Sequence, residues 1–276
     1  MVIYDIVSSI VLYKNDRELL RKAIHSFLQT NLRVKLYLLD NSPDQSLSDL
    51  GGLDPRIEYI FNDANLGFGK AHNIGIRLSM PEARYHLVLN PDIWFDAGVL
   101  DELFAFMEAN LDVGQVMPKV LYPGGEIQRL CKLLPTPADL FLRRFFPWFP
   151  GAEDRNRRYE LIDSGYDKVM NIPYLSGCFM LLRNTVLQEI GLFDERIFMY
   201  IEDADLTRRV YQRYKAIFYP RVFVYHHYQK GSYKNKKLML YNIHGAFIYF
   251  TKWGWVFDRE RKKINQQVLK AYIPNP

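Results

Sequence analysis

The first part of the chain alternates short apolar runs with stretches of helical periodicity. Apolar runs with the length and branching of buried strands lie at residues 6–12, 34–39, 57–61 and 87–89. Helical spacing of apolar positions follows at residues 17–29, 67–78 and 97–108. Asp16 stands just before the first of these helices and is suited to cap it. Strands that alternate with helices at this spacing predict an α/β fold with a largely parallel sheet.

The pattern becomes irregular after Val116. Four prolines interrupt residues 133–163, a stretch that holds the aromatic patch FLRRFFPWFP at residues 141–150. The patch is either a loop folded over the core or a lid or membrane-touching element. We favour the second interpretation because exposed aromatic patches usually bind something. Ordered elements are predicted again in the following segments: residues 172–182, 185–190 and 222–228.

Near the C-terminus, a stripe of apolar residues at helical spacing lies within a basic segment of the chain. The stripe consists of Leu240, Ile243, Phe247 and Phe250, spaced i, i+3, i+7 and i+10. Such a helix packs on the rest of the protein, lies on a membrane, or does both. The segment from residue 230 to residue 263 has a net charge of about +7. Because the whole chain has a net charge of +5, the other residues sum to about −2. Basic residues interleaved with Trp and Tyr favour an anionic membrane surface over nucleic acid.

The composition is that of a globular protein with a sizeable core. Of the 276 residues, 49% are hydrophobic and 24% are charged, which suffices for one or two domains. Cys131 and Cys178 lie far apart and match no metal or redox spacing, so we expect reduced core thiols. We find neither a leader sequence nor an apolar run of about 18 residues, and therefore expect a cytoplasmic location.

A carboxylate follows the apolar run at residues 87–89. The sequence continues Asn90-Pro91-Asp92, and Pro91 cannot extend a central strand because it lacks an N–H group. Asp92 is therefore expected at the carboxyl end of a buried strand, where open α/β sheets bind ligands. A carboxylate beside an amide oxygen suits a hard cation and the phosphates that it carries. The alternative is a helix cap by Asp92 or Asp96.

Further candidate residues stand at strand ends and helix starts. Asp40 follows the second apolar run and either closes an Asx turn or contacts a nucleotide base or ribose. The run NLGFGKAHN at residues 65–73 has glycines that permit close approach of a ligand, although it could be a simple helix start. His226 and His227 alternate on a predicted strand, so at most one of them points into a given site.

Three carboxylates crowd the start of a predicted helix at Glu202, Asp203 and Asp205. The helix dipole favours their ionised form, so ordinary capping is one interpretation. Capping needs only one carboxylate, however, and three within four residues repel one another. An ionised aspartate at such a position is a good general base, and we favour this functional interpretation.

Together these motifs resemble the family 2 inverting glycosyltransferases of the GT-A fold, particularly the rhamnosyltransferase-like branch. The matching segments, in order, are Val7 to Tyr13, LDNS at 39–42, NLGFGKAHN at 65–73, LNPD at 89–92, SGC at 176–178, GLFDE at 191–195, YIEDAD at 200–205 with Arg208 or Arg209, and His226 followed by Gly231-Ser232. The resemblance covers residues 2–235. It implies a Rossmann-like, mostly parallel central sheet flanked by helices.

The resemblance assigns roles to individual residues. It implies that Asp203 is the catalytic base within the Glu202-Asp203 motif. It implies a nucleotide-sugar pocket made by Tyr13, Asp40, Asn65, Gly67, Lys70, Asn73, Asn90, Asp92 and Gly177. Asp92 matches the last carboxylate of the family's Asp-x-Asp metal motif, whose first Asp is Asn90 here. His226 is our choice for the second ligand of Mg²⁺ or Mn²⁺, with His227 as the alternative.

The expected activity is inverting transfer of a sugar from a nucleotide diphosphate to a hydroxyl of a saccharide acceptor. By analogy the donor is dTDP-rhamnose and the acceptor is lipid-linked, as in bacterial surface polysaccharide synthesis. The alternatives are a metal-dependent nucleotidyltransferase and a non-enzymatic nucleotide-sugar or nucleic-acid binding protein. We expect a catalytic domain at residues 1–235, divided after residue 116 into nucleotide-sugar and acceptor halves. Residues 236–276 would form a helical extension on the inner membrane face, and a homodimer would be compatible with this organisation.

Overall fold

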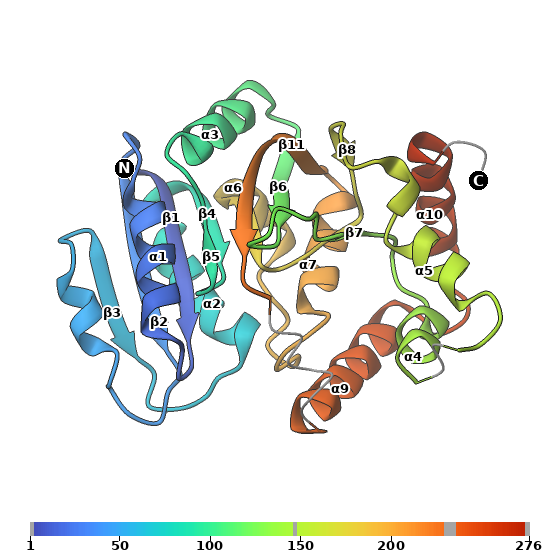
Figure 1. The fold of residues 1–276 in the computed structure, drawn as a ribbon, viewed down its shortest axis with the longest axis horizontal. Helices are drawn as coiled ribbons and strands as arrows, with labels where there is room; N and C mark the ends of the chain where they lie inside the picture. The colour runs from blue at the N-terminus through green and yellow to red at the C-terminus, as the bar shows by residue number, and fades with distance from the viewer. Residues whose placement is uncertain (1–2, 146–147, 229–235, 274–276) are drawn as a thin grey trace.

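Within the part of the chain that the structure describes, nine strands form one mixed sheet. The structure is a computed structural model that describes residues 3–145, 148–228 and 236–273, without the side chains of residues 142–145. Gly231 and Ser232, which belong to the family resemblance, and residues 142–147 of the aromatic patch therefore lie outside the described side chains. The strand order is β3-β2-β1-β4-β10-β6-β11-β5, with β8 paired to β11 (Figure 1).

The first half of the chain forms the parallel part of the sheet. Its elements in chain order are β1 (Tyr4–Leu12), α1 (Arg17–Leu28), β2 (Val34–Asp40), the 3-10 helix η1 (Ser48–Gly52), β3 (Ile57–Phe61), α2 (Phe68–Ser79) and β4 (Ala83–Leu89). Strand β1 lies between β2 and β4, with Ile6 opposite Val34 and Tyr85. Asp16 caps α1 by accepting from the N–H groups of Glu18 and Leu19. These elements confirm the β-α-β pattern expected from the sequence.

The second part of the sheet is mixed. Its elements are β5 (Ile93–Trp94), α3 (Val99–Ala109), β6 (Val113–Leu121), β8 (Met170–Asn171), β10 (Phe179–Arg183), α6 (Asn184–Ile190) and β11 (Lys215–His226). Strand β10 runs antiparallel to both β4 and β6, whereas β6 and β11 are parallel. The boundary that we expected after residue 116 lies inside β6, so one continuous sheet joins the two halves.

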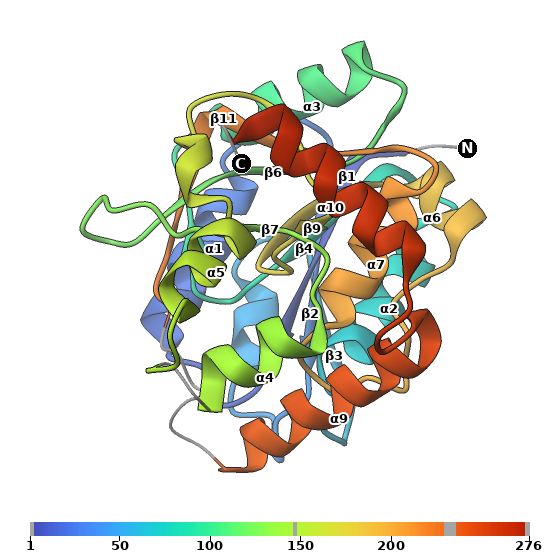
Figure 2. The same ribbon diagram turned by 90° about the vertical axis from the view of Figure 1, so that its right-hand side faces the viewer.

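The sheet carries helices on both faces. Figure 2 shows α1 on one side of the sheet and α2, α6 and α7 (Glu202–Tyr211) on the other. A buried polar link lies under α2, where the Ser9 hydroxyl is 2.7 Å from His72 Nδ1 and 2.7 Å from His86 Nε2. Burial lowers the pKa of both imidazoles, that of His86 to about 3. Both side chains are therefore neutral in the folded protein at physiological pH.

The stretch at residues 133–163 is more ordered than its prolines suggested. It contains α4 (Pro137–Phe145), α5 (Ala152–Tyr159) and the 3-10 helix η2 (Ile162–Ser164). Pro137 is the first residue of α4, a position where the missing N–H group has no helical partner to lose. The segment at residues 172–182, predicted to be ordered, contains β10 and also β9 (Tyr174–Leu175), which pairs with β7 (Cys131–Lys132) outside the main sheet.

The C-terminal extension consists of α9 (Lys236–Trp253) and α10 (Arg259–Tyr272). The predicted apolar stripe is only partly buried in α9, because Phe250 is fully buried whereas Leu240 is 61% exposed and Phe247 is 56% exposed. The buried face uses Ala246, Tyr249 and Phe250, with Gly245 beside them. None of the described helices has both the length and the apolar composition needed to cross a membrane.

Candidate active site

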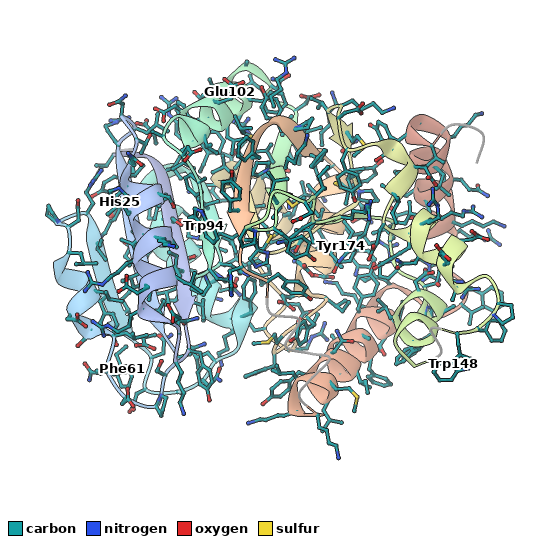
Figure 3. All side chains as sticks on the ribbon, viewed as in Figure 1. His25, Phe61, Trp94, Glu102, Trp148 and Tyr174 are labelled. Atoms are coloured by element: carbon teal, nitrogen blue, oxygen red, sulfur yellow. The ribbon has the colours of Figure 1, made fainter. Side chains whose placement is uncertain are left out.

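A cavity of about 1330 Å³ opens at the carboxyl ends of the central strands. Its walls include residues at or just past the ends of β1, β2, β4, β6 and β11. Tyr174 of β9 lines the cavity and lies near the middle of the molecule in Figure 3, whereas Trp148 lies at the periphery beside α4. The cavity thus occupies the place where open α/β sheets bind ligands.

Most of the predicted site residues meet in this cavity, although they come from distant segments. Those that line it are Tyr13, Asn65, Gly67, Asn90, Asp92, Gly177, Glu202, Asp203 and His226. Pro91 ends β4 as expected, and the backbone N–H of Asn90 donates to the Cys178 carbonyl at 2.9 Å. Adjacent segments of the cavity wall are therefore held together by main-chain bonds.

Three residues that we expected in the nucleotide-sugar pocket do not line the cavity. Asp40 is fully buried, and its carboxylate accepts from the Ser42 N–H at 2.8 Å and the Tyr59 hydroxyl at 2.7 Å. The Asx turn is therefore present, and a contact between Asp40 and a nucleotide stays a prediction. Its neighbour Asn41 lines the cavity instead.

Asn73 and Lys70 also differ from the expectation. The buried Asn73 amide donates to the Phe193 carbonyl and to Glu195, and its oxygen accepts from the Phe193 N–H, all at 3.0 Å. Asn73 thereby joins α2 to the segment before α7 and has a structural role. Lys70 lies on an exposed face of α2.

His226 and Asp92 form a close pair at one side of the cavity. His226 Nε2 lies 3.4 Å from Asp92 Oδ1, and the His226 side chain is 6% exposed. Gln128 fixes the ring, because its Nε2 donates to the His226 carbonyl at 2.7 Å and its Oε1 faces His226 Nδ1 at 2.9 Å. Since Oε1 can only accept, Nδ1 carries a hydrogen. His227, by contrast, is exposed and does not line the cavity.

This arrangement suits a cation between the two side chains. With a hydrogen on Nδ1, a neutral His226 directs the lone pair of Nε2 toward the negative carboxylate of Asp92. Burial opposes protonation, but hydrogen bonds with Asp92 and Cys178 raise the pKa of His226 to about 10. The pair therefore attracts either a proton or a metal ion, and imidazole and carboxylate are both suitable metal ligands. Two of the predicted ligands therefore lie side by side, although the described residues contain no cluster of three or more His, Cys, Asp or Glu side chains that could hold a metal ion.

Asp203 stands in the first turn of α7 and faces the cavity. Its Oδ2 accepts from the Gly177 N–H at 2.8 Å, and its Oδ1 accepts from the Ala204 N–H at 2.9 Å. Burial raises the pKa of Asp203, while the charge of Lys132 and the two N–H groups act in the opposite direction. A carboxylate whose pKa is moved toward neutrality is a better general base.

Glu202 has a different environment from its neighbour. It is 5% exposed, and its Oε2 is buried without a hydrogen-bond partner among the described residues. Burial and the charge of Asp203 raise the pKa of Glu202 well above its ordinary value. Burial without a described hydrogen-bond partner therefore disfavours the ionised form of Glu202, whereas two backbone N–H groups stabilise the ionised form of Asp203.

Several cavity residues were not predicted from the sequence. They include Gln128, which orients His226, together with Arg129, Lys132 and Tyr174. The only signal near Gln128 was the turn Pro123-Gly124-Gly125, which does not indicate that its amide reaches back to β11. Lys132 lies 5.0 Å from the centre of the Tyr174 ring, a contact that depends on the pairing of β7 with β9.

The sequence relatives of this chain are transferases. The protein named N-acetylglucosaminyl-diphospho-decaprenol L-rhamnosyltransferase of Mycobacterium tuberculosis is 27% identical over 216 residues, covering 72% of this chain and 68% of that protein. Low-salt glycan biosynthesis hexosyltransferase Agl10 of Haloferax volcanii is 25% identical over 209 residues, covering 74% of this chain. This chain spans 61% of the length of Agl10.

The fold is shared with longer proteins. GalNAc-T7, solved with UDP, GalNAc and Mn²⁺, superposes with a TM-score of 0.61 at 15% identity over 82% of this chain and 44% of its own. TarS of S. aureus superposes with a TM-score of 0.59 at 13% identity over 96% of this chain and 43% of its own. These structures share the GT-A architecture. A family model described as "Glycosyl transferase family 2" matches residues 8–191, and the chain belongs to this family.

Proposed function

We propose that this protein is an inverting glycosyltransferase that moves a sugar from a nucleotide diphosphate to a hydroxyl of a saccharide acceptor. One observation carries the proposal: a single cavity brings together the Asn65–Gly67 segment, the Asp92–His226 pair and Asp203. The Asn65–Gly67 segment would contact the nucleotide, and the Asp92–His226 pair would contact the diphosphate. Asp203 would contact the attacking hydroxyl. Membership of the family supports the same reaction class.

In this mechanism Asp203 takes the proton of the acceptor hydroxyl as that oxygen attacks the anomeric carbon. General base catalysis of this kind contributes about 10²- to 10⁴-fold to the rate. A single displacement from the face opposite the leaving group inverts the anomeric centre. Asp92 and His226 would hold Mg²⁺ or Mn²⁺, which when bound offsets negative charge on the departing diphosphate.

Rhamnose carried by dTDP is the donor sugar that we propose, and a lipid-linked saccharide is the proposed acceptor. The name of the mycobacterial relative, which states an L-rhamnosyltransferase and a diphospho-decaprenol substrate, supports both choices. The name of the archaeal relative supports a role in glycan biosynthesis. For this chain, the rhamnose donor and the lipid-linked acceptor are proposals.

The C-terminal extension offers a surface that would bring such an enzyme to its acceptor at an anionic membrane. We name as the aromatic corner the exposed residues Phe247, Trp255, Val256 and Phe257, of which Phe257 is 94% exposed. The Phe247 and Trp255 rings are 5.6 Å apart, so the corner is one apolar surface. Exposed lysines and arginines of α9 and α10 accompany it, as expected for contact with anionic lipid.

The proposed membrane surface is also connected to the cavity. Lys237 and Tyr241 of α9 line the cavity, while Phe247 on the same helix belongs to the aromatic corner. A lipid-linked acceptor lying along α9 would thus reach the cavity from the membrane surface. In this proposal residues 1–235 form the catalytic unit, peripheral at the inner membrane face, and residues 236–276 form the docking extension.

The catalytic proposal is tested by the variant Asp203→Asn. A panel of nucleotide sugars is offered with a lipid-linked saccharide, with and without a chelator, and release of nucleoside diphosphate is measured. We expect turnover to fall by about 10²- to 10⁴-fold, with the donor dissociation constant within about twofold of the parent value. The matched control is Asp112→Asn, a change at the amino end of β6. Near-normal turnover of Asp203→Asn would reject the assignment, and pyrophosphate release from a nucleoside triphosphate would support a nucleotidyltransferase.

The membrane proposal is tested by flotation with vesicles that contain anionic lipid. We expect the parent protein to float at physiological salt and the double variant Trp255→Ser, Phe257→Ser to remain at the bottom of the gradient. The control variant Leu111→Ser removes another exposed apolar side chain, which is 74% exposed and lies outside the extension. Absence of binding by the parent protein would refute the membrane proposal without touching the catalytic one.

A further inference from the structure

The turn that precedes α7 has an unusual backbone. Tyr200 and Ile201 have φ values of 73° and 70°, so two consecutive non-glycine residues occupy the left-handed region. Ile201 is β-branched, which makes this conformation still less favourable. Such a turn persists only when surrounding structure holds it in place. Its position is important because Glu202 and Asp203 follow directly in the cavity wall.

Helix α9 presses its backbone against this turn at Gly245. A Cβ atom added at Gly245 would lie 2.6 Å from the Tyr200 carbonyl oxygen and 3.2 Å from Ile197 Cγ2. A contact of 2.6 Å with backbone cannot be relieved by rotating a side chain, so either the turn or the helix would have to move. Glycine at this position therefore permits the close approach of α9 to the turn.

The C-terminal extension also contacts α7 through buried Asp205. The carboxylate of Asp205, two residues after Asp203, accepts from Trp253 Nε1 and Lys252 Nζ, each at 2.7 Å. Both partners belong to the last turn of α9. The side chain of Asp205 has no solvent exposure, so the two partners from α9 replace the hydration of Oδ1, while Arg209 of α7 donates to Oδ2 at 3.0 Å.

One turn further along α7, Arg208 makes a second connection. Its guanidinium pairs with both oxygens of Asp258, at 2.7 and 3.0 Å, and stacks 4.1 Å from the Trp253 ring centre. Arg208 is 1% exposed. Asp258 also caps α10 by accepting from the Arg261 N–H at 2.8 Å. Helix α7 is thus joined to both helices of the extension at its first and second turns.

We propose that the C-terminal extension positions Asp203, and that Gly245 is the positioning residue through which α9 fixes the Tyr200–Ile201 turn. The inference rests on the proposed function for the role of Asp203 as base. It adds a second role for the extension, which the membrane proposal treats as a docking surface. The bond from the Gly177 N–H to Asp203 Oδ2 is the contact that a displaced turn would lengthen first.

The test is the variant Gly245→Ala. Misplacement of a catalytic group by about 1 Å can cost about 10²-fold in rate, so we expect kcat to fall by at least about 10-fold. The donor KM should stay within about twofold, because in the proposed function Asp203 acts on the acceptor hydroxyl and not on the donor. The acidic limb of the kcat profile should move to higher pH, because loss of the Gly177 N–H bond disfavours ionised Asp203.

Two control variants separate a displacement of the Tyr200–Ile201 turn from other effects of a glycine-to-alanine change or of a change on α9. Gly52→Ala makes the same change where an added Cβ has no atom within 4 Å. His244→Ala changes the exposed neighbouring position on α9. Both should keep the parent kcat and pH profile. Alanine favours helix formation over glycine, so Gly245→Ala should lower activity without a matching fall in Tm.

A second measurement is independent of sugar transfer. Amide hydrogen exchange in the parent protein and the variants reports the Gly177 and Ala204 N–H groups that Asp203 accepts from. We expect faster exchange at both in Gly245→Ala and, more weakly, in Trp253→Phe, which loses the bond to Asp205 but keeps an aromatic ring. If Gly245→Ala does not fold, the positioning role is tested with Trp253→Phe, by its kcat, its pH profile and the amide exchange at Gly177 and Ala204.

The outcomes for positioning and for function are distinct. Unchanged exchange at Gly177 and Ala204 in the folded variants would overturn the positioning role, and so would an unchanged kcat and acidic limb. A parent protein that transfers no sugar would refute the proposed function, yet the exchange measurement would still accept or reject the positioning of Asp203.

Discussion

The predicted metal site can be tested by a change at Gln128, which contacts the predicted ligand His226 and is not itself a predicted ligand. Its Oε1 holds the hydrogen on His226 Nδ1 and so leaves Nε2 for the ion. The variant Gln128→Met keeps the approximate volume of the side chain but removes both hydrogen bonds to His226. The imidazole then loses its preferred tautomer and orientation, while Asp92 and His226 themselves remain.

The expected magnitude follows from the two lost contacts. Removal of an outer partner of a metal-binding histidine typically costs about 10- to 100-fold in metal affinity, or about 1.4 to 2.7 kcal/mol. Binding of a metal also displaces the proton that a pKa of about 10 places on His226. Below that pH the apparent Mn²⁺ affinity of the parent protein should therefore rise by up to about tenfold per pH unit.

Calorimetric titration with Mn²⁺ over a series of pH values measures both effects. The control is Gln115→Met, the same substitution at another fully buried glutamine near the opposite end of β6. Equal Mn²⁺ affinity of Gln128→Met and the parent protein would refute the role of Gln128. A parent protein whose Mn²⁺ affinity does not change with pH would refute His226 as a ligand.

Three further predictions concern stability. Burial lowers the pKa of His86 to about 3, whereas its value in the unfolded chain is about 6.5, so the unfolded state binds more protons below pH 6.5. The urea concentration at the unfolding midpoint should therefore decrease as the pH is lowered from 6.5 to 3, and His86→Asn should make this decrease smaller. Asp40→Asn should reduce the free energy of unfolding by about 1–3 kcal/mol in urea titration, with donor affinity unchanged, since its partners are within the fold. Arg208→Met should cost about 3–5 kcal/mol by the same measurement because it removes the guanidinium that pairs with both oxygens of buried Asp258, and a loss below 1 kcal/mol would contradict the burial of that pair.

Local sequence signals predicted the elements of the first half well, because each is defined within a few residues. Asp16 precedes an amphipathic run and does cap α1. The strand that ends at Leu89 is followed by Pro91, and Asp92 does lie at the carboxyl edge of the sheet. The crowded start of α7 at Glu202 was likewise visible from its carboxylates.

Features that depend on contacts between distant residues could not be predicted in this way. The hydrogen bond from the Tyr59 hydroxyl to the Asp40 carboxylate could not be predicted, because it depends on the pairing of β2 with β3. The role of Gln128 depends on a loop that folds back to β11. The sequence indicated the apolar stripe of α9 but not the close packing at Gly245 and Ala246, because these small residues carry little hydrophobic signal.

The place of β10 in the sheet has a consequence for how the chain folds during synthesis. Strand β10 inserts between β4 and β6, yet it is made about 90 residues after β4 ends. At typical translation rates that interval lasts roughly 5 to 20 seconds, during which β4 presents an unpaired edge to the cytosol or to a neighbouring nascent chain. The part of the sheet made of β1 to β4 is therefore expected to leave the ribosome with an edge that favours aggregation. Pulse-labelled nascent chains that stop before residue 179 should recruit chaperones more than chains that stop after residue 183.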